Sequence, residues 1–139
     1  MDVWSGPGHA GAVAFIVDGM NVIGSRPDGW WRDRAAARRR LVDELVPLSD
    51  AGMEITVVFD GRETAGESEQ AAAHGVTVFF APGGPNAADD AIVMLLKGLA
   101  LPADTVVVTS DRALVERVRQ LGATVESAKA FRSRLSEAE

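Results

Sequence analysis

Runs of consecutive apolar residues, each about as long as a β-strand, alternate along this chain with segments of helical pattern. In the runs "AFIV", "ITVVF" and "TVVV" the apolar residues follow one another instead of alternating with polar ones. A strand of that kind is buried on both faces, which is typical of a parallel sheet covered by helices. The pattern therefore predicts an α/β fold, a three-layer α/β/α sandwich with a central parallel sheet of about five strands.

The predicted elements fill most of the chain and leave its beginning without a pattern. The strands are expected at residues 12–18, 54–60, 75–81, 104–110 and 123–127. The helices are expected at roughly residues 30–50, 63–73, 86–100, 111–121 and 127–137. Residues 1–12 are Gly-rich and patternless, so we expect a flexible N-terminal leader before a single domain over residues 13–139.

Composition narrows the class of protein further. The chain has no cysteine, which excludes disulfides, thiolate nucleophiles and Cys-ligated metal sites. The N-terminus lacks the basic region of a signal peptide, and no segment is long enough to span a membrane, so we expect a cytoplasmic protein without a membrane partner. The net charge of −6 argues against coating nucleic acid through the overall field, yet it leaves room for a local basic patch.

Acidic residues stand where several predicted strands end. Asp18, Asp60 and Asp111 lie at or just past the ends of three strands, and Asp89 and Asp90 open the helix that follows a fourth. In an open parallel sheet the C-terminal ends of the strands meet at one edge, where ligands bind. Four separate segments therefore deliver carboxylates to the same edge.

Each acid alone fits a helix cap or a turn. Clustered carboxylates, however, repel and raise one another's pKa, so a divalent cation is the natural way to neutralise them. Oxygen ligands indicate Mg²⁺ or Mn²⁺ in preference to zinc. On the helical wheel Asp89 lies at the flank of the buried face and Asp90 points away, which makes Asp89 the better ligand.

Other roles for the segment around Asp18, as a phosphate-binding loop or as a phosphorylated aspartate, fit the sequence less well. Gly19 and Gly24 have the spacing of a phosphate-binding loop, but the Lys-Ser/Thr pair that must follow is missing. A phosphatase would place a second aspartate at the position of Met20, and a receiver domain would pair Asp18 with another acid. The acidic metal site is the hypothesis that remains.

The motifs "VDGMN", "VVFDG", "NAADD" and "VTSD" together resemble the NYN domains, which are PIN-like nucleases, and most closely their YacP-like branch. The resemblance covers roughly residues 13–135. It implies strand order 3-2-1-4-5, one or two Mg²⁺ or Mn²⁺ ions, and hydrolysis of RNA phosphodiesters by metal-activated water. One departure is Met20, where relatives commonly carry an aromatic residue.

The resemblance also assigns roles to residues of this chain. It implies metal-site carboxylates at Asp18, Asp60, Asp89 and Asp111, and Asp90, at a position that is often acidic, is a further candidate metal ligand. Asn21 would orient Asp18 or a water molecule, and Thr109 and Ser110 would supply supporting hydroxyls.

Several arginines and tryptophans are candidates for contact with RNA. Arg34 and Arg38 fall within the apolar stripe of the helix expected at residues 30–50, where they would either hold phosphate or pair with Asp33, Asp43 or Glu44. Trp30 lies off that stripe and could stack on a base, whereas Trp31 is expected to pack on the core. Arg26 and Arg62 follow acidic strand ends and are further phosphate candidates.

The first reading is therefore a metal-dependent ribonuclease, an endonuclease acting on single-stranded RNA, with ribosome-associated RNA as one candidate substrate. The alternatives are a non-catalytic RNA-binding module on the same fold and a phosphotransfer domain of receiver or phosphatase type.

Overall fold

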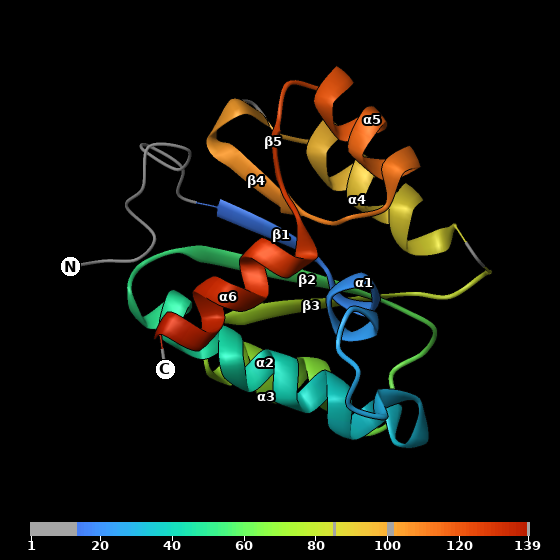
Figure 1. Ribbon diagram of the computed structural model, residues 1–139, viewed down its shortest axis with the longest axis vertical. Helices are drawn as coiled ribbons and strands as arrows, with labels where there is room; N and C mark the ends of the chain where they lie inside the picture. Colours follow the sequence, from blue (N-terminus) through green and yellow to red (C-terminus); the bar gives the residue numbers. More distant parts are fainter. Residues whose placement is uncertain (1–13, 85, 100–101, 139) are drawn as a thin grey trace.

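The central sheet has the predicted parallel architecture. The computed structural model describes residues 14–84, 86–99 and 102–138, so the leader expected at residues 1–12 lies outside the described part. All paired strands are parallel, in the order β3-β2-β1-β4-β5 (Figure 1). The strands are β1 Ala14–Asp18, β2 Glu54–Asp60, β3 Val76–Ala81, β4 Thr105–Val108 and β5 Thr124–Glu126. Both the fold class and the strand order are confirmed.

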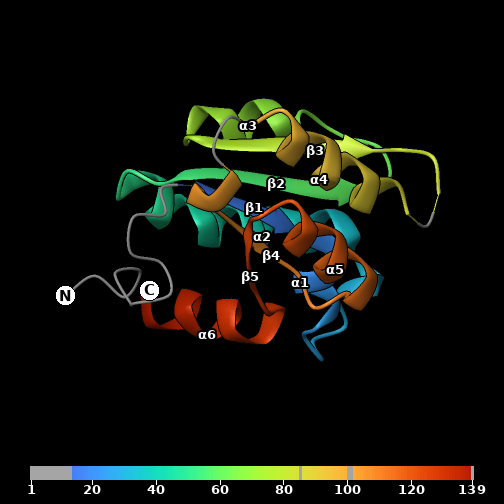
Figure 2. The same cartoon turned by 90° about the horizontal axis from the view of Figure 1, so that it is seen from above.

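Helices cover the two faces of the sheet (Figures 1 and 2). One layer holds α1 Gly19–Gly24, α2 Arg34–Asp50, α3 Glu67–Ala73 and α6 Ala128–Ala138. The other holds α4 Ala87–Lys97 and α5 Arg112–Gln120. Two short 3-10 helices are η2 Trp30–Arg32 and η3 Pro102–Asp104. No helix among the described residues has both the length and the apolar character needed to cross a membrane.

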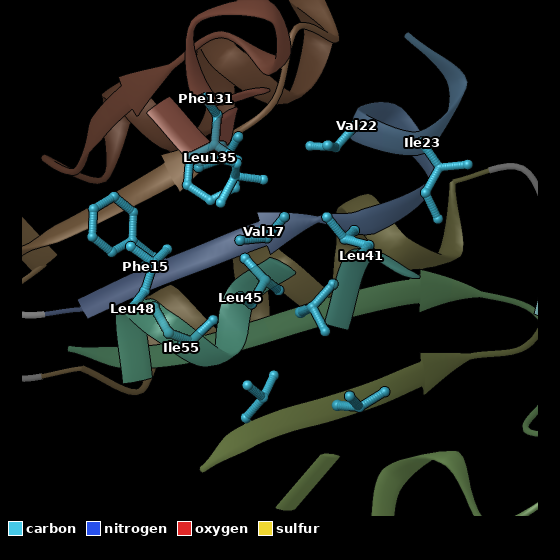
Figure 3. Close-up of a cluster of buried hydrophobic side chains, with 14 of the residues drawn as sticks. Phe15, Val17, Val22, Ile23, Leu41, Leu45, Leu48, Ile55, Phe131 and Leu135 are labelled. Atoms are coloured by element: carbon cyan, nitrogen blue, oxygen red, sulfur yellow. The ribbon is translucent and has the colours of Figure 1, made fainter. Parts of the chain in front are cut away.

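The consecutive apolar residues of the strands supply two hydrophobic cores. Successive side chains of β1 point to opposite faces, so Phe15 and Val17 join the core beneath α2 and α6, whereas Ile16 joins the core beneath α4 and α5. Figure 3 shows Leu41, Leu45 and Leu48 of α2 beside β1 in the first of these cores. Burying each such side chain contributes about 1.5–3 kcal/mol.

The helix expected at residues 30–50 is interrupted near its start. Asp33 caps α2 and its Oδ1 accepts a hydrogen bond from the Ala36 N–H at 3.0 Å, while residues 30–32 form η2. The apolar stripe expected for this segment assumed one continuous helix over residues 30–50. Because α2 starts only after the cap at Asp33, residues 30 and 31 do not continue that stripe. The prediction that Trp31 packs on the core is therefore wrong: its side chain is 57% exposed, and Trp30 packs against the core.

The first helix, α1, begins directly after Asp18 and was not predicted. Its sequence, "GMNVIG", starts and ends with glycine, which disfavours helix by about 1 kcal/mol per residue relative to alanine. Packing explains the first of these glycines: a Cβ at Gly19 would lie 2.4 Å from Cε1 of Phe59 and 2.9 Å from Cγ2 of Val57. The helix can leave the sheet at Asp18 only because residue 19 has no side chain.

We predict that Gly19→Ala destabilises the fold by about 1–3 kcal/mol, the usual range for overpacking a core. Gly24→Ala, at the other end of α1, is the matched control, since its Cβ would meet only Trp30, at 3.9 Å. Urea unfolding of both variants measures the difference. A Gly19→Ala protein as stable as the Gly24→Ala protein would contradict this account, and Phe59→Leu should restore part of the loss.

Candidate metal centre

Asp18 ends the central strand and is almost fully buried, with 5% of its surface exposed. Val17 pairs with Val108 of β4, so Thr109, the next residue, comes level with Asp18. The Thr109 hydroxyl donates a hydrogen bond to Oδ2 of Asp18 at 2.8 Å and accepts one from the Asp111 N–H at 3.1 Å. One threonine thus links two of the predicted acidic positions.

Asp60 and Asp111 each receive a hydrogen bond from the start of a helix. Oδ1 of Asp60 accepts from the Ala88 N–H at 3.3 Å, and Oδ1 of Asp111 accepts from the Leu114 N–H at 3.0 Å. Both carboxylates therefore also accept hydrogen bonds from helix starts, the capping role that the sequence left open. It occupies one oxygen of each carboxylate and draws the starts of α4 and α5 toward the ends of β2 and β4.

The four carboxylates lie close enough to affect one another's protonation. Burial, together with the charges of Asp89, Asp60 and Asp111, raises the pKa of Asp18 to about 6, against the lowering effect of the Thr109 hydrogen bond. Burial likewise raises the pKa of Asp89, with further contributions from Asp111 and Asp60. The structure therefore brings together Asp18, Asp60, Asp89 and Asp111 from four separate segments.

The chemistry of these donors fits a hard divalent cation such as Mg²⁺ or Mn²⁺, because every donor is a carboxylate oxygen. Burial raises the pKa of both Asp18 and Asp89, and the charges of the neighbouring carboxylates add to that rise, which such an ion would relieve. Within the described residues, however, no three acidic or imidazole side chains stand close enough to form a ready-made metal site. The cluster fits a cation by its chemistry and charge, and it is not a preformed cage.

Asn21 and Ser110 hold the surrounding segments together. Oδ1 of Asn21 in α1 accepts from the Ser110 N–H at 2.8 Å, and the Ser110 hydroxyl accepts from the Ala128 N–H of α6 at 2.9 Å. The Ser110 hydroxyl therefore serves the start of α6, whereas the hydroxyl of Thr109 reaches Asp18. In this structure Asn21 positions the loop between β4 and α5.

Asp90, the fifth candidate metal ligand from the sequence, does not join the other four carboxylates. Its side chain is 65% exposed, and its Oδ1 accepts a hydrogen bond from Arg117 of α5 at 2.9 Å. The charge of Arg117 partly opposes the rise in the pKa of Asp89, which burial and the neighbouring carboxylates cause. Arg117 is thus a basic residue beside the cluster that the sequence analysis missed, because only the neighbouring positions of α4 and α5 reveal it.

Arg38, predicted to contact RNA, is buried in an ion pair instead. Its Nε donates to Oε2 of Glu67 at 2.7 Å and its Nη2 donates to Oε1 at 3.0 Å. The Arg38 hydrogen bond, helped by hydrogen bonds from Thr64, lowers the pKa of Glu67 to about 2. Of the two roles that the sequence left open for Arg38, the structure shows internal pairing, with a partner the sequence did not suggest.

Of the other arginines predicted to contact RNA, Arg26 is mostly buried in an ion pair, whereas Arg34 and Arg62 are exposed. Arg26 pairs with Glu44 at 2.7 Å, and the guanidinium of Arg34 lies 5.3 Å from the centre of the Trp30 ring. Arg62 is exposed in the loop directly after Asp60. Of these three, Arg62 stands nearest in the chain to a carboxylate of the cluster, two residues after Asp60.

A five-stranded parallel sheet in this order, with carboxylates gathered at its C-terminal edge, defines a PIN-like α/β domain. A family model of the YacP-like NYN domain matches residues 15–139, and the chain belongs to that family. This confirms the resemblance seen in the sequence and supports a nuclease-like, RNA-related domain. No curated protein matches the chain.

Two solved structures of Rae1 (YacP) from Bacillus subtilis are similar to this fold. One has 26% sequence identity and a TM-score of 0.71, over 90% of this chain and 74% of that chain. The other is a single-residue variant with 24% identity and a TM-score of 0.73, over 90% of this chain and 76% of that chain. The likeness extends over nearly the whole described domain.

We predict that Asp18→Asn stabilises the protein at neutral pH in the presence of EDTA. An unfolded aspartate titrates near pH ~3.9, but folded Asp18 keeps its proton up to about pH 6, so the native state loses stability as the pH rises through this interval. Above pH ~6, where Asp18 is charged, Asp18→Asn should raise the free energy of unfolding by on the order of 2–3 kcal/mol relative to the wild-type protein. Unfolding at pH 3.5 and pH 7.5 measures the difference, which should vanish at the lower pH. An equal effect at both pH values would contradict this account, and Asp104→Asn is the exposed control.

We also predict that Arg38→Met destabilises the fold by about 3–5 kcal/mol, because it leaves the Glu67 carboxylate buried without its partner. The lowered pKa of Glu67 places the pair's contribution above pH ~4.3, the ordinary value for glutamate, and that contribution is lost as the pH falls toward 2. Urea unfolding from pH 7 to pH 3 should show the difference shrinking. Arg39→Met, at an exposed neighbouring position, is the control. A variant of unchanged stability that binds RNA more weakly would instead assign Arg38 to the RNA surface.

Proposed function

We propose that this protein is a Mg²⁺- or Mn²⁺-dependent endoribonuclease that hydrolyses phosphodiester bonds of single-stranded RNA at the C-terminal edge of its sheet. One observation carries the proposal: the carboxylate of Asp18 lies among three others, and its burial, with a further contribution from their charges, raises its pKa to about 6. Membership of the YacP-like NYN family supports RNA as the class of substrate. Ribosome-associated RNA is one candidate substrate, and the proposed place of action is the cytoplasm.

In this proposal Asp18, Asp60, Asp89 and Asp111 would hold the metal. A divalent ion held there would supply a water of lowered pKa as nucleophile and positive charge to stabilise the leaving oxygen. The hydroxyl of Thr109 fixes the orientation of the Asp18 carboxylate through its hydrogen bond. Asn21 acts as a positioning residue, because its bond to the Ser110 N–H fixes the loop that carries Thr109 and Asp111.

The acidic edge needs nearby positive charge if it is to accept a polyanion. Arg117 lies beside Asp89 and is held by Asp90, and Arg62 follows Asp60 in an exposed loop. Both guanidinium groups are suited to phosphate, which they can hold with two parallel hydrogen bonds. We assign them to the substrate side of the site.

The second candidate is a non-catalytic RNA-binding module on the same fold. It is favoured by the finding that, in the part of the chain that the structure describes, the acidic side chains form no ready-made metal site. A phosphotransfer domain is less well supported. Asp18 is 5% exposed and already hydrogen-bonded, which makes it a poor acceptor for a phosphoryl group.

Cleavage of a circular single-stranded RNA tests the proposal, because a circle has no ends and only an endonuclease can open it. We expect linear products with Mg²⁺ or Mn²⁺, none with EDTA, and a loss of at least about a hundredfold in rate for Asp18→Asn, since removing one key charge-stabilising group commonly costs about 10²–10³ in rate. Asp104→Asn, in η3 before β4, should cleave normally. Cleavage that survives both EDTA and Asp18→Asn would overturn the metal site, and an inert protein that binds the circle would establish the binding module.

A further inference from the structure

A surface groove runs along the connection between α1 and α2, apart from the four carboxylates. It consists of two hollows of about 240 and 290 Å³ that share Arg26, Asp28 and Arg40. The first hollow reaches Trp30 and Arg32, and the second reaches Arg132 of α6. We call the two hollows together the α1–α2 groove.

The groove is basic in a chain that is acidic as a whole. Its lining contains four arginines and three acids, whereas the whole chain has 14 basic and 20 acidic residues. Two of the arginines have acidic partners: Arg26 pairs with Glu44 at 2.7 Å and Arg40 with Asp28 at 2.9 Å. The third acid, Asp33, caps α2. Four arginines against three acids leave one positive charge in excess, and within the described residues neither Arg32 nor Arg132 forms an ion pair with an acid of the lining.

Arg132, which lines the second hollow, has a side-chain donor without a partner in the described part of the chain. Its Nε is buried and has no hydrogen-bond partner among the residues that the structure describes. A buried donor without a partner is unfavourable, and a guanidinium in this state favours an anion nearby. Phosphate matches the fork of guanidinium donors better than a single-point acceptor does.

The other end of the groove is aromatic. Trp30 lines the first hollow and packs against the hydrophobic core, which holds the ring in place. Trp31 meets Trp30 edge-on at 6.0 Å, and Arg34, which does not line the hollow, lies over the Trp30 ring. Ile23, Ala36 and Ala37 complete an apolar wall. An aromatic ring in an apolar hollow, with guanidinium groups at a short distance, is the arrangement that binds an unpaired base and its phosphate.

Helix α1 connects the groove to the carboxylates. Asp18 stands immediately before this helix, while Ile23 near its end and Arg26 just beyond it line the first hollow. A helix of six residues is ~9 Å long, so one strand of RNA can reach both places.

We propose that the α1–α2 groove binds one unpaired nucleotide of the RNA substrate, with its base against Trp30 and a phosphate toward Arg40 and Arg132. The proposal rests on the proposed function for the identity of the ligand as RNA. It adds a subsite that would set where along a strand the acidic edge cuts.

Binding is tested without catalysis, with Asp18→Asn protein in EDTA and a fluorescein-labelled single-stranded RNA. We expect Arg132→Gln to raise the Kd about tenfold, as expected for the loss of a hydrogen bond to a charged group. Arg119→Gln, an exposed arginine of α5 outside the groove, should leave the Kd within about twofold. An unchanged Kd for Arg132→Gln would overturn the proposal.

Photo-crosslinking tests the base position without altering Trp30, whose removal from the core could unfold the protein. RNA that carries 5-bromouridine should crosslink to Trp30, as mapped by mass spectrometry of the peptides. A crosslink confined to residues outside the groove would overturn the assignment. The two proposals fail separately. RNA that binds in the groove but is never cut would contradict only the nuclease proposal. An enzyme that cuts RNA with the same KM before and after Arg132→Gln would contradict only the subsite.

Discussion

The burial of the Asp18 carboxylate is the constraint on which the rest of the site depends. A charged group at the end of a central strand, 5% exposed and next to three other carboxylates, is unfavourable for folding unless something compensates it. The hydrogen bond from Thr109 compensates only in part, because the pKa of Asp18 still rises to about 6. The fold therefore holds a concentration of negative charge that a divalent cation would relieve.

The neighbouring structure keeps that charge in place. Gly19 lets the chain turn directly after Asp18, Asn21 ties α1 to the loop after β4, and Ser110 in that loop caps α6. Asp60 and Asp111 meanwhile hold the starts of α4 and α5. Stability and function thus share the same residues, since the hydrogen bonds that begin the helices also bring the carboxylates to one edge.

Much of this arrangement could be predicted from the sequence. The five strands follow from consecutive apolar runs, and the gathering of Asp18, Asp60, Asp89 and Asp111 follows from parallel strands that end at a common edge. These inferences succeed because they depend on periodicity and topology, which extend over many residues. The helical phase placed Asp89 nearer the buried face than Asp90, and Asp90, although also a candidate ligand, is exposed and paired with Arg117.

Features that depend on a single cap or on distant contacts could not be predicted. The cap at Asp33 shifted the phase of α2 and exchanged the expected places of Trp30 and Trp31. The pairing of Arg38 with Glu67, 29 positions away, required α2 and α3 to lie side by side. The same holds for the α1–α2 groove, whose lining includes α6, and for Arg117 beside Asp89. The sequence shows that these arginines are charged, but it does not show which acidic residue each of them pairs with.

The most direct test of the acidic metal centre is the dependence of protein stability on Mn²⁺ at pH 7.5. A cation that binds the folded state stabilises it by an amount that grows with concentration, about 2.7 kcal/mol at a hundred times the Kd. We expect the free energy of unfolding of the wild-type protein to rise with Mn²⁺ and that of Asp18→Asn to stay flat. An equal rise in both proteins would place the ion elsewhere, and no rise in either would contradict a metal centre at Asp18.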